Sequence, residues 1–149
     1  MIVADNSVAT KWVFREELSD LADLLLAEQI AAAALIAVPR LLPFEFTNVA
    51  LKRVRRNGLA LDDALMAVDT LWSFPSEIHP RTTQEHERIH HRALEFAAIY
   101  GLSAACDAHY VALAESIDCD LWTADRRLLR EVGSQFPRVR SLDSFVPAQ

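Results

Sequence analysis

Four acidic side chains of this sequence stand where their neighbours are mostly apolar, and they are Asp5, Glu45, Asp107 and Asp125. Asp5 follows the apolar run 2–4, and Asp125 follows the run 121–124. Glu45 lies between two phenylalanines, and Asp107 lies in an alanine-rich segment. An ionised carboxylate that leaves water must be paired, strongly hydrogen-bonded or bound to a cation. Any one of these acids could be a helix cap or a salt-bridge partner, but the set of four favours a bound cation.

Carboxylates that converge without a cysteine or a well-placed histidine form an all-oxygen site. Such a site suits Mg²⁺ or Mn²⁺ better than zinc. These ions activate water and neutralise the charge that develops on a phosphate during in-line displacement. We interpret Asp5, Asp107 and Asp125 as metal ligands. Glu45 would bind a second ion or position the attacking water, and the chemistry would be the hydrolysis of a phosphodiester.

The elements that must position these acids alternate between short strands and helices. The expected strands are 2–5, 36–38, 77–79, 120–123 and 139–142, and the expected helices are 18–34, 42–57, 61–72, 83–100, 104–117 and 125–131. The expected helix caps are Ser19, Ser103 and a capping box of Thr82 with Glu85, and the expected stops are Gly58 and Gly101. Strands separated by helices require crossovers, which produce a parallel sheet covered on both faces. The sequence therefore predicts an α/β fold with about five strands.

The expected sheet explains how the acids meet. In an open parallel sheet, ligands bind at the carboxyl ends of the strands. Asp5 and Asp125 stand at two such ends. If the first strand is central and the strand 120–123 lies beside it, these two acids come together. The helices that carry Glu45 and Asp107 can then close the site.

The length and composition of the chain limit the classes of protein to which it can belong. Its 149 residues suit one domain, 1–149. The longest apolar run, 30–38, is shorter than the ~20 residues of a membrane span, and we expect a cytoplasmic protein without membrane contact. The two cysteines, Cys106 and Cys119, lack a metal-binding spacing, and we interpret both as reduced packing residues.

The segments that carry the four acids resemble those of the PIN-domain ribonucleases, and most closely the VapC-type toxins of bacterial toxin-antitoxin pairs. The matching segments are VADNSV around Asp5, LLPFEFTNVALKRVRRNG around Glu45, LSAACDAHYVALAE around Asp107 and LWTADRRL around Asp125. Their order and spacing cover nearly the whole chain. One departure is Cys106, because many relatives have an aromatic residue before this aspartate.

The resemblance implies a PIN-like three-layer fold with a parallel sheet of strand order 3-2-1-4-5. It implies endoribonuclease activity with Mg²⁺ or Mn²⁺ at the acids, RNA as the substrate and a neutralising antitoxin as the protein partner. We also expect a homodimer. Ser7 and Thr123 become groups that orient the metal-binding carboxylates, since hydroxyls near such carboxylates can do so.

Basic residues form a cluster beside the second acid, although the net charge of −6 opposes nucleic-acid binding by the chain as a whole. At ~100° per residue, Lys52 and Arg56 share a helix face with Glu45, and Arg53 lies at its border. At a rise of ~1.5 Å per residue, Lys52 and Arg56 lie about 10 and 16 Å from Glu45, a reach that suits phosphates flanking the scissile one. We predict that these residues bind the RNA backbone, which carries affinity but no sequence information. The alternative is a solvated helix face.

Three alternative functions remain. His86, Glu87 and His90 form an H-E-x-x-H pattern, which is typical of zinc metalloproteases, with Glu115 as a conceivable third ligand. The extended form of that pattern fails, because Ala93 stands where its glycine would fall. A phosphatase that uses Asp5 as its nucleophile lacks the acid expected two residues later. A PIN-like module that only binds RNA or a partner is the third alternative, but all four acids are present.

Overall fold

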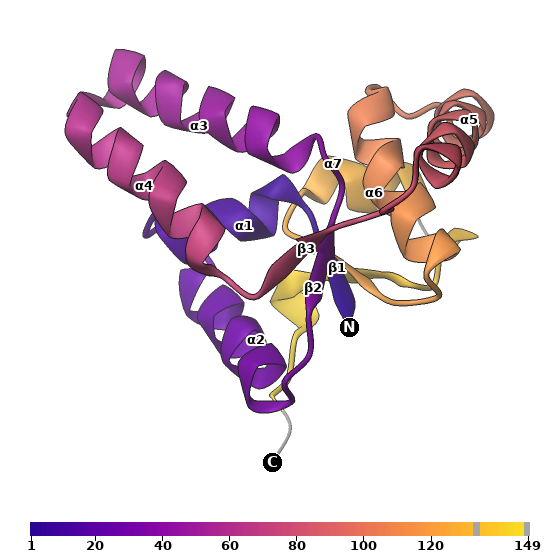
Figure 1. Ribbon diagram of the computed structural model, residues 1–149, viewed down its shortest axis with the longest axis horizontal. Coiled ribbons are helices and arrows are strands. Elements are labelled where there is room, and N and C mark those ends of the chain that lie inside the picture. The colour runs from indigo at the N-terminus through magenta and orange to yellow at the C-terminus, as the bar shows by residue number, and fades with distance from the viewer. Residues whose placement is uncertain (133–134, 148–149) are drawn as a thin grey trace.

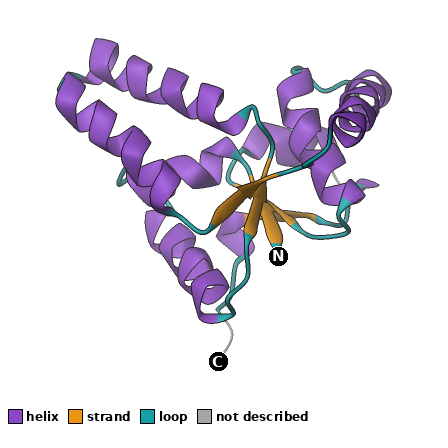
Figure 2. Ribbon diagram, viewed as in Figure 1, coloured by secondary structure: helices purple, strands orange, loops and turns teal. Residues whose placement is uncertain are grey.

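The computed structural model describes residues 1–132 and 135–147, and a five-stranded sheet forms its centre (Figures 1 and 2). The strands are β1 (Ile2–Ala4), β2 (Ile36–Val38), β3 (Ser76–Ile78), β4 (Leu121–Thr123) and β5 (Val139–Ser141). Their order is β3-β2-β1-β4-β5, and every neighbouring pair is parallel. The predicted α/β class and the strand order 3-2-1-4-5 are confirmed.

Helices cover both faces of this sheet, as the three-layer prediction requires (Figure 2). They are α1 (Asn6–Val13), α2 (Ser19–Ala31), α3 (Leu42–Asn57), α4 (Leu61–Ser73), α5 (Thr83–Tyr100), α6 (Ala105–Ser116) and α7 (Arg126–Val132), with the short 3-10 helix η2 (Leu142–Ser144) near the C-terminus. On one side α1 packs against β1 and β4 and also contacts α2, α3 and α4. On the other side α6 packs against the same two strands and carries α5 on its outer surface. Helices α3 and α4 pack against each other and form a hairpin that extends away from the sheet (Figure 1).

The central strand is the most completely buried part of the sheet. Ile2, Val3 and Ala4 are all buried, because β1 has a strand on each edge and a helix on each face. A strand covered in this way reads as a continuous apolar run rather than an alternating one. Helix α6 is equally buried along Tyr110 to Ala114, so it is the inner helix of its layer. Asp5 follows β1 and Asp107 lies on α6, so both acids are attached to deeply buried elements of the protein.

Local sequence signals identified the ends of several helices correctly. The Thr82 side chain accepts a hydrogen bond from the Glu85 backbone N–H, and the Glu85 carboxylate accepts one from the Thr82 backbone N–H, as the predicted capping box requires. Gly58 and Gly101 end α3 and α5 at positive φ angles of 69° and 64°. At such angles a side chain would be strained, which explains why glycine stands there.

The predictions that Ser19 and Ser103 cap helices were wrong. Ser19 is the first residue of α2, and its hydroxyl donates to the backbone carbonyls of Lys11 and Phe14 instead of capping the helix. Helix α6 begins after Ala104, and no side chain caps it. Both helices are held by burial of their inner faces, which removes the need for a side-chain cap.

Helix α1 was absent from the sequence prediction. Its eight residues include Asn, Ser, Thr and two valines, which have modest helix propensity. Two other factors stabilise it. Val8 and Ala9 are fully buried, and the Asp5 carboxylate caps its first turn. The omission matters for function, because this helix fixes the orientation of Asp5.

No single helix among residues 1–132 and 135–147 is long and apolar enough to cross a membrane. Helices α5 and α6 meet the length and composition criteria only when they are taken together, and the chain bends by 116° between them.

Candidate active site

Asp5 lies at the carboxyl end of the central strand and is only 6% exposed. Its Oδ1 accepts hydrogen bonds from the backbone N–H groups of Ser7 (2.9 Å) and Val8 (3.1 Å) and from the Ser7 hydroxyl (2.6 Å). Its Oδ2 accepts one from the Thr123 hydroxyl at 2.5 Å. All four partners are donors, which suits an ionised carboxylate.

Burial and hydrogen bonding act on Asp5 in opposite directions. Desolvation raises the pKa of this carboxyl from 3.8 to about 6, although the hydrogen bonds from Ser7, Thr123 and Val8 lower it. The group is therefore ionised at neutral pH, but at a free-energy cost that a nearby cation would relieve.

The hydroxyls of Ser7 and Thr123 connect the ends of the two strands. The Ser7 hydroxyl accepts a hydrogen bond from the Ala124 backbone N–H at 2.8 Å, and the Thr123 hydroxyl accepts one from the Asp125 backbone N–H at 2.9 Å. Each hydroxyl thus accepts from the chain after β4 while it donates to Asp5. Together they fix Asp5 relative to the segment that carries Asp125.

Glu45 approaches the site from the first turn of α3, and Tyr110 of α6 orients it. The Tyr110 hydroxyl donates to Glu45 Oε2 at 2.5 Å, across 65 positions of sequence. The pKa of Glu45 is raised to about 7: desolvation is the largest cause, the charges of Asp107 and Asp5 also raise it, and the tyrosine hydrogen bond lowers it. Tyr110 is almost fully buried, and its pKa lies well above 10, so it remains a donor.

Asp107 and Asp125 share one cation, the guanidinium of Arg127. An Nη atom of Arg127 lies 2.8 Å from Asp107 Oδ2 and 3.7 Å from Asp125 Oδ2. The other oxygen of Asp125 caps α7 by accepting from the backbone N–H groups of Arg127 (2.7 Å) and Leu128 (3.3 Å). Desolvation raises the pKa of Asp107, Arg127 lowers it, and the charge of Asp125 raises it.

The four predicted acids therefore come together at one edge of the sheet. The charges of Asp107 and Asp5 raise the pKa of Glu45, and the charge of Asp125 raises the pKa of Asp107. These interactions connect all four groups, which arrive from the ends of β1 and β4 and from the helices α3 and α6. An arrangement of like charges needs a source of positive charge, and Arg127 supplies part of it.

The side chains around the four acids fit a hard cation by the chemistry of their donors. The site offers carboxylate and hydroxyl oxygens, which Mg²⁺ and Mn²⁺ prefer. As the side chains stand, no three His, Cys, Asp or Glu residues of the described part of the chain are placed to hold one ion. Arg127 lies against two of the carboxylates in this arrangement.

Two residues of this site were not predicted as part of it. Tyr110 follows Asp107 by three positions on α6, and residues with this spacing lie on the same side of a helix. That spacing is a signal that could have placed the tyrosine near the acids. Arg127 was not predicted, and no sequence signal identifies its two partners.

The predicted RNA-binding residues of α3 have different surroundings. Lys52 and Arg56 are exposed. Arg53 is half-buried, because its guanidinium lies 2.5 Å from Glu16 and 4.3 Å from the centre of the Phe14 ring. The structure therefore gives Arg53 protein partners, whereas Lys52 and Arg56 extend into solvent.

The residues of the H-E-x-x-H pattern have partners that are unlike those of a zinc protease. The Nδ1 atom of His90 lies 2.7 Å from Nε2 of His109. Glu115, the conceivable third ligand, binds Arg92 through both carboxylate oxygens at 2.8 and 2.9 Å. These contacts engage one ring nitrogen of His90 and both carboxylate oxygens of the third ligand of the proposed zinc site.

The free cysteines differ in burial. Cys119 is buried, as a packing residue should be, whereas Cys106 is exposed on α6, and its interpretation as a packing residue was wrong. Cys106 lies in the first turn of α6, where desolvation and the charges of Glu45 and Asp107 raise the pKa of its thiol.

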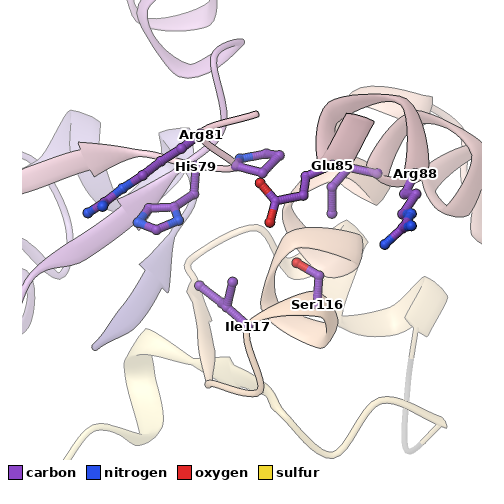
Figure 3. Close-up of a pocket in the computed structure, with 8 residues that line it drawn as sticks. His79, Arg81, Glu85, Arg88, Ser116 and Ile117 are labelled. Atoms are coloured by element: carbon purple, nitrogen blue, oxygen red, sulfur yellow. The ribbon is translucent and has the colours of Figure 1, made fainter. Parts of the chain in front are cut away.

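A pocket of about 440 Å³ lies between the start of α5 and the end of α6, and none of the four acids lines it (Figure 3). His79, Glu85, Arg88 and Ser116 are among its lining residues. The Glu85 carboxylate, which belongs to the capping box, lies inside this pocket between His79 and Arg88 (Figure 3). The pocket is thus separate from the acidic site.

The first test of the site concerns Tyr110. We expect Tyr110→Phe to raise the pH at which Glu45 is half-protonated, because it removes the hydrogen bond that favours the ionised form. A hydrogen bond to a charged group contributes about 1.5–3 kcal/mol, so the increase should be roughly one pH unit or more. The measurement is a carbon NMR titration of glutamate carboxyls in chelator. Tyr100→Phe is the matched control, and equal midpoints for Glu45 in all three proteins would show that Tyr110 does not position it.

No protein-family model and no curated protein matches the chain. Among solved structures, the chain is similar to the crystal structure of PAE2754 from Pyrobaculum aerophilum. The match covers 96% of this chain and 91% of that one, with 19% sequence identity and a TM-score of 0.66. At this level of identity the likeness shows a shared fold.

Proposed function

We propose that this protein is a metal-dependent endoribonuclease of the PIN type, and that it acts as the toxin of a bacterial toxin-antitoxin pair in the cytoplasm. The observation that carries the proposal is the convergence of four carboxylates at the carboxyl edge of a parallel sheet. Desolvation, and after it the charges of the neighbouring acids, raise the pKa values of Glu45 and Asp107. A site that accumulates negative charge in this way is suited to a divalent cation.

Asp5, Asp107 and Asp125 would hold Mg²⁺ or Mn²⁺, and Glu45 would hold a second ion or the attacking water. The cation supplies activation of water and neutralisation of charge on the phosphate. Ser7 and Thr123 keep Asp5 ionised and oriented, because both donate to it. Tyr110 holds one oxygen of Glu45, which leaves the other oxygen available to orient a water or take its proton. Arg127 would move from Asp107 and Asp125 when the cation binds, and it would then be free to contact the substrate.

A protein partner is part of the proposal, with RNA as the substrate. The hairpin of α3 and α4 exposes large apolar side chains, which include Phe44 (74% exposed), Leu61, Leu65, Met66 and Trp72. Phe44 and Trp72 also line a pocket of about 560 Å³. Exposed apolar patches of this kind are typical of protein interfaces. They support binding by an antitoxin and by a second copy of the chain.

The ends of the RNA fragments test the proposed reaction. Direct attack of water on the phosphodiester should leave a 5′-phosphate and a 3′-hydroxyl, and the reaction should require Mg²⁺ or Mn²⁺. The experiment incubates the purified protein with a generic RNA and determines both ends of the products. Products with 2′,3′-cyclic phosphates would contradict the proposal, because they arise from attack by the ribose and not by water. Intact RNA would favour a module that only binds RNA.

The basic residues of α3 give a second test. We expect the Lys52→Ala, Arg56→Ala double variant to bind RNA more weakly and to lose about 0.7 in the log-log salt slope for each phosphate contact removed. Arg53→Ala is the contrast, because Arg53 binds Glu16 and stacks on Phe14. It should lower the free energy of unfolding by about 1 kcal/mol and leave the salt slope unchanged. RNA affinity at several salt concentrations measures both effects, and equal slopes for wild type and the double variant would mean that this face is only solvated.

A further inference from the structure

A separate pocket of about 240 Å³ lies between the loop after β2 and the helices α5 and α6, and none of the four acids lines it. We call it the histidine pocket, because four of the five histidines of the chain line it together with Arg40: His79, His86, His90 and His109. None of its lining residues is an aspartate or a glutamate. At ~30 Å³ for each water molecule, it has the volume of about eight waters, which leaves room for a small anion such as phosphate.

The ring of His86 has one nitrogen that the protein does not use. It donates a hydrogen bond to the backbone carbonyl of Pro80, while its Nε2 is buried and has no hydrogen-bond partner within residues 1–132 and 135–147. Buried polar atoms are nearly always paired, because an unpaired one costs free energy. The arrangement of His86 therefore points to a partner from outside the chain.

The hydrogen bonds of His90 and His109 also leave one ring nitrogen of His90 available to a ligand. Nδ1 of His109 lies 2.7 Å from the Ala105 carbonyl, so it must carry the proton that this carbonyl accepts. Nε2 of the neutral His109 ring is then an acceptor, and Nδ1 of His90 donates to it at 2.7 Å. Nε2 of His90 is left for a ligand, as it is in His86: it is an acceptor in the neutral ring and becomes a donor when the ring is protonated.

The charges around the histidine pocket favour an anion over a metal cation. Arg40 is exposed and has no ion-pair partner in the part of the chain that the structure describes. Desolvation lowers the pKa of His86, the charges of Arg40 and His90 lower it further, and Glu85 on the same helix opposes them. His79 is 3.2 Å from Glu77, which balances its charge when it is protonated. Thr83, the first residue of α5, also lines the pocket, where the helix dipole is positive.

We propose that the histidine pocket binds a phosphate group of the RNA substrate, with Arg40 as the charged donor and with Nε2–H of His86 and His90, in the protonated forms of these rings, as hydrogen-bond donors. The identity of the phosphate rests on the proposed function. Arg40 precedes Glu45 by five residues, and His109 follows Asp107 by two residues, so the elements that build the pocket also carry two of the acids. On the proposed function, this phosphate belongs to the same RNA strand as the scissile one.

Inorganic phosphate tests the pocket without reference to RNA. We expect saturable changes in the imidazole NMR signals of His86 and His90 when phosphate is added to the wild-type protein, with stronger binding at pH 6 than at pH 8. Arg40→Ala should weaken this binding about tenfold, the size expected for loss of one charged hydrogen bond. Arg88→Ala is the matched control, because Arg88 lies on α5 but lines the neighbouring pocket of Figure 3. An absent response, or an equal loss in both variants, would overturn the proposal, as would a response to Zn²⁺ alone.

RNA binding by a cleavage-deficient Asp5→Asn protein then identifies the source of the phosphate. Adding Arg40→Ala or His86→Gln to this protein should weaken RNA affinity about tenfold, whereas adding Arg88→Ala should change it less than twofold. If inorganic phosphate binds but these variants leave RNA affinity unchanged, the pocket serves a free phosphate, and the assignment to RNA is wrong. If the wild-type protein fails to cut RNA while the phosphate and RNA results hold, the proposed nuclease function fails and the pocket remains an RNA-phosphate site.

Discussion

Replacing Asp5 with asparagine should lower the rate of RNA cleavage by roughly 1000-fold or more while the fold persists. The loss follows because the variant removes one negative charge from the set that holds the cation, and a 1000-fold effect corresponds to about 4 kcal/mol of transition-state stabilisation. The asparagine keeps an oxygen that can accept the backbone N–H groups of Ser7 and Val8. Its amide can donate to the Thr123 hydroxyl, which already accepts from Asp125. The cap of α1 is therefore retained, and lost activity cannot be ascribed to unfolding.

The control for this substitution is Asp69→Asn, which makes the same chemical change at an exposed position of α4. Cleavage rates with a generic RNA and circular dichroism of all three proteins complete the experiment. Full activity of Asp5→Asn, in a preparation free of wild-type protein, would exclude Asp5 from the site.

The metal-free protein should become less stable as the pH rises from about 4 to about 7. In the folded state the pKa of Asp5 is about 6 instead of 3.8, and that of Glu45 is about 7 instead of 4.5. Within this window the folded protein binds more protons than the unfolded chain, so the free energy of unfolding falls with rising pH. The stabilisation is complete below the unfolded pKa values and is lost above the folded ones. For the buried Asp5 alone it amounts to about 3 kcal/mol.

Divalent cations should oppose this loss, because they bind the ionised carboxylates of the folded protein. At neutral pH and a concentration 100 times the dissociation constant, Mn²⁺ would stabilise the fold by about 2.7 kcal/mol, which raises the melting temperature by roughly 5–10 °C. The measurement is thermal unfolding from pH 4 to pH 8, in chelator and in Mn²⁺.

Surface carboxylates complicate the pH dependence, because Glu77, Glu85 and Glu115 have lowered pKa values and therefore stabilise the fold as the pH rises. The informative quantity is thus the difference between wild type and Asp5→Asn in chelator. That difference should grow with pH, with the variant the more stable protein at pH 7. Parallel curves for the two proteins in chelator would refute the raised pKa of Asp5, and a melting temperature that does not change with Mn²⁺ would refute the binding of a cation at the site.

Sequence patterns predicted the parts of this fold that depend on short-range signals. The capping box of Thr82 and the stop at Gly58 involve residues within one helical turn, and each was located correctly. The placement of Asp5 at a strand end could be predicted from the apolar run that precedes it, whereas the strand order was implied by the family resemblance and not by these local signals.

Features that depend on long-range contacts could not be predicted in the same way. Helix α1 forms because Val8 is buried by distant elements and because Asp5 caps the helix. Neither factor can be recognised from the hydrophobic periodicity of its eight residues. The hydrogen bond from Tyr110 to Glu45 joins two helices that are far apart in sequence. The position of Arg127 between Asp107 and Asp125 depends on how α6 and α7 meet, which one sequence does not specify.

The central claim is that the four carboxylates hold a cation that cuts RNA, and a metal titration of cleavage tests it most directly. Wild-type protein is stripped with chelator, incubated with a generic RNA, and supplied with increasing Mn²⁺ or Mg²⁺. We expect no cleavage in chelator, and cleavage that rises and saturates as either ion is added. Cleavage at an equal rate in chelator, or intact RNA at every concentration of both ions, would contradict the account.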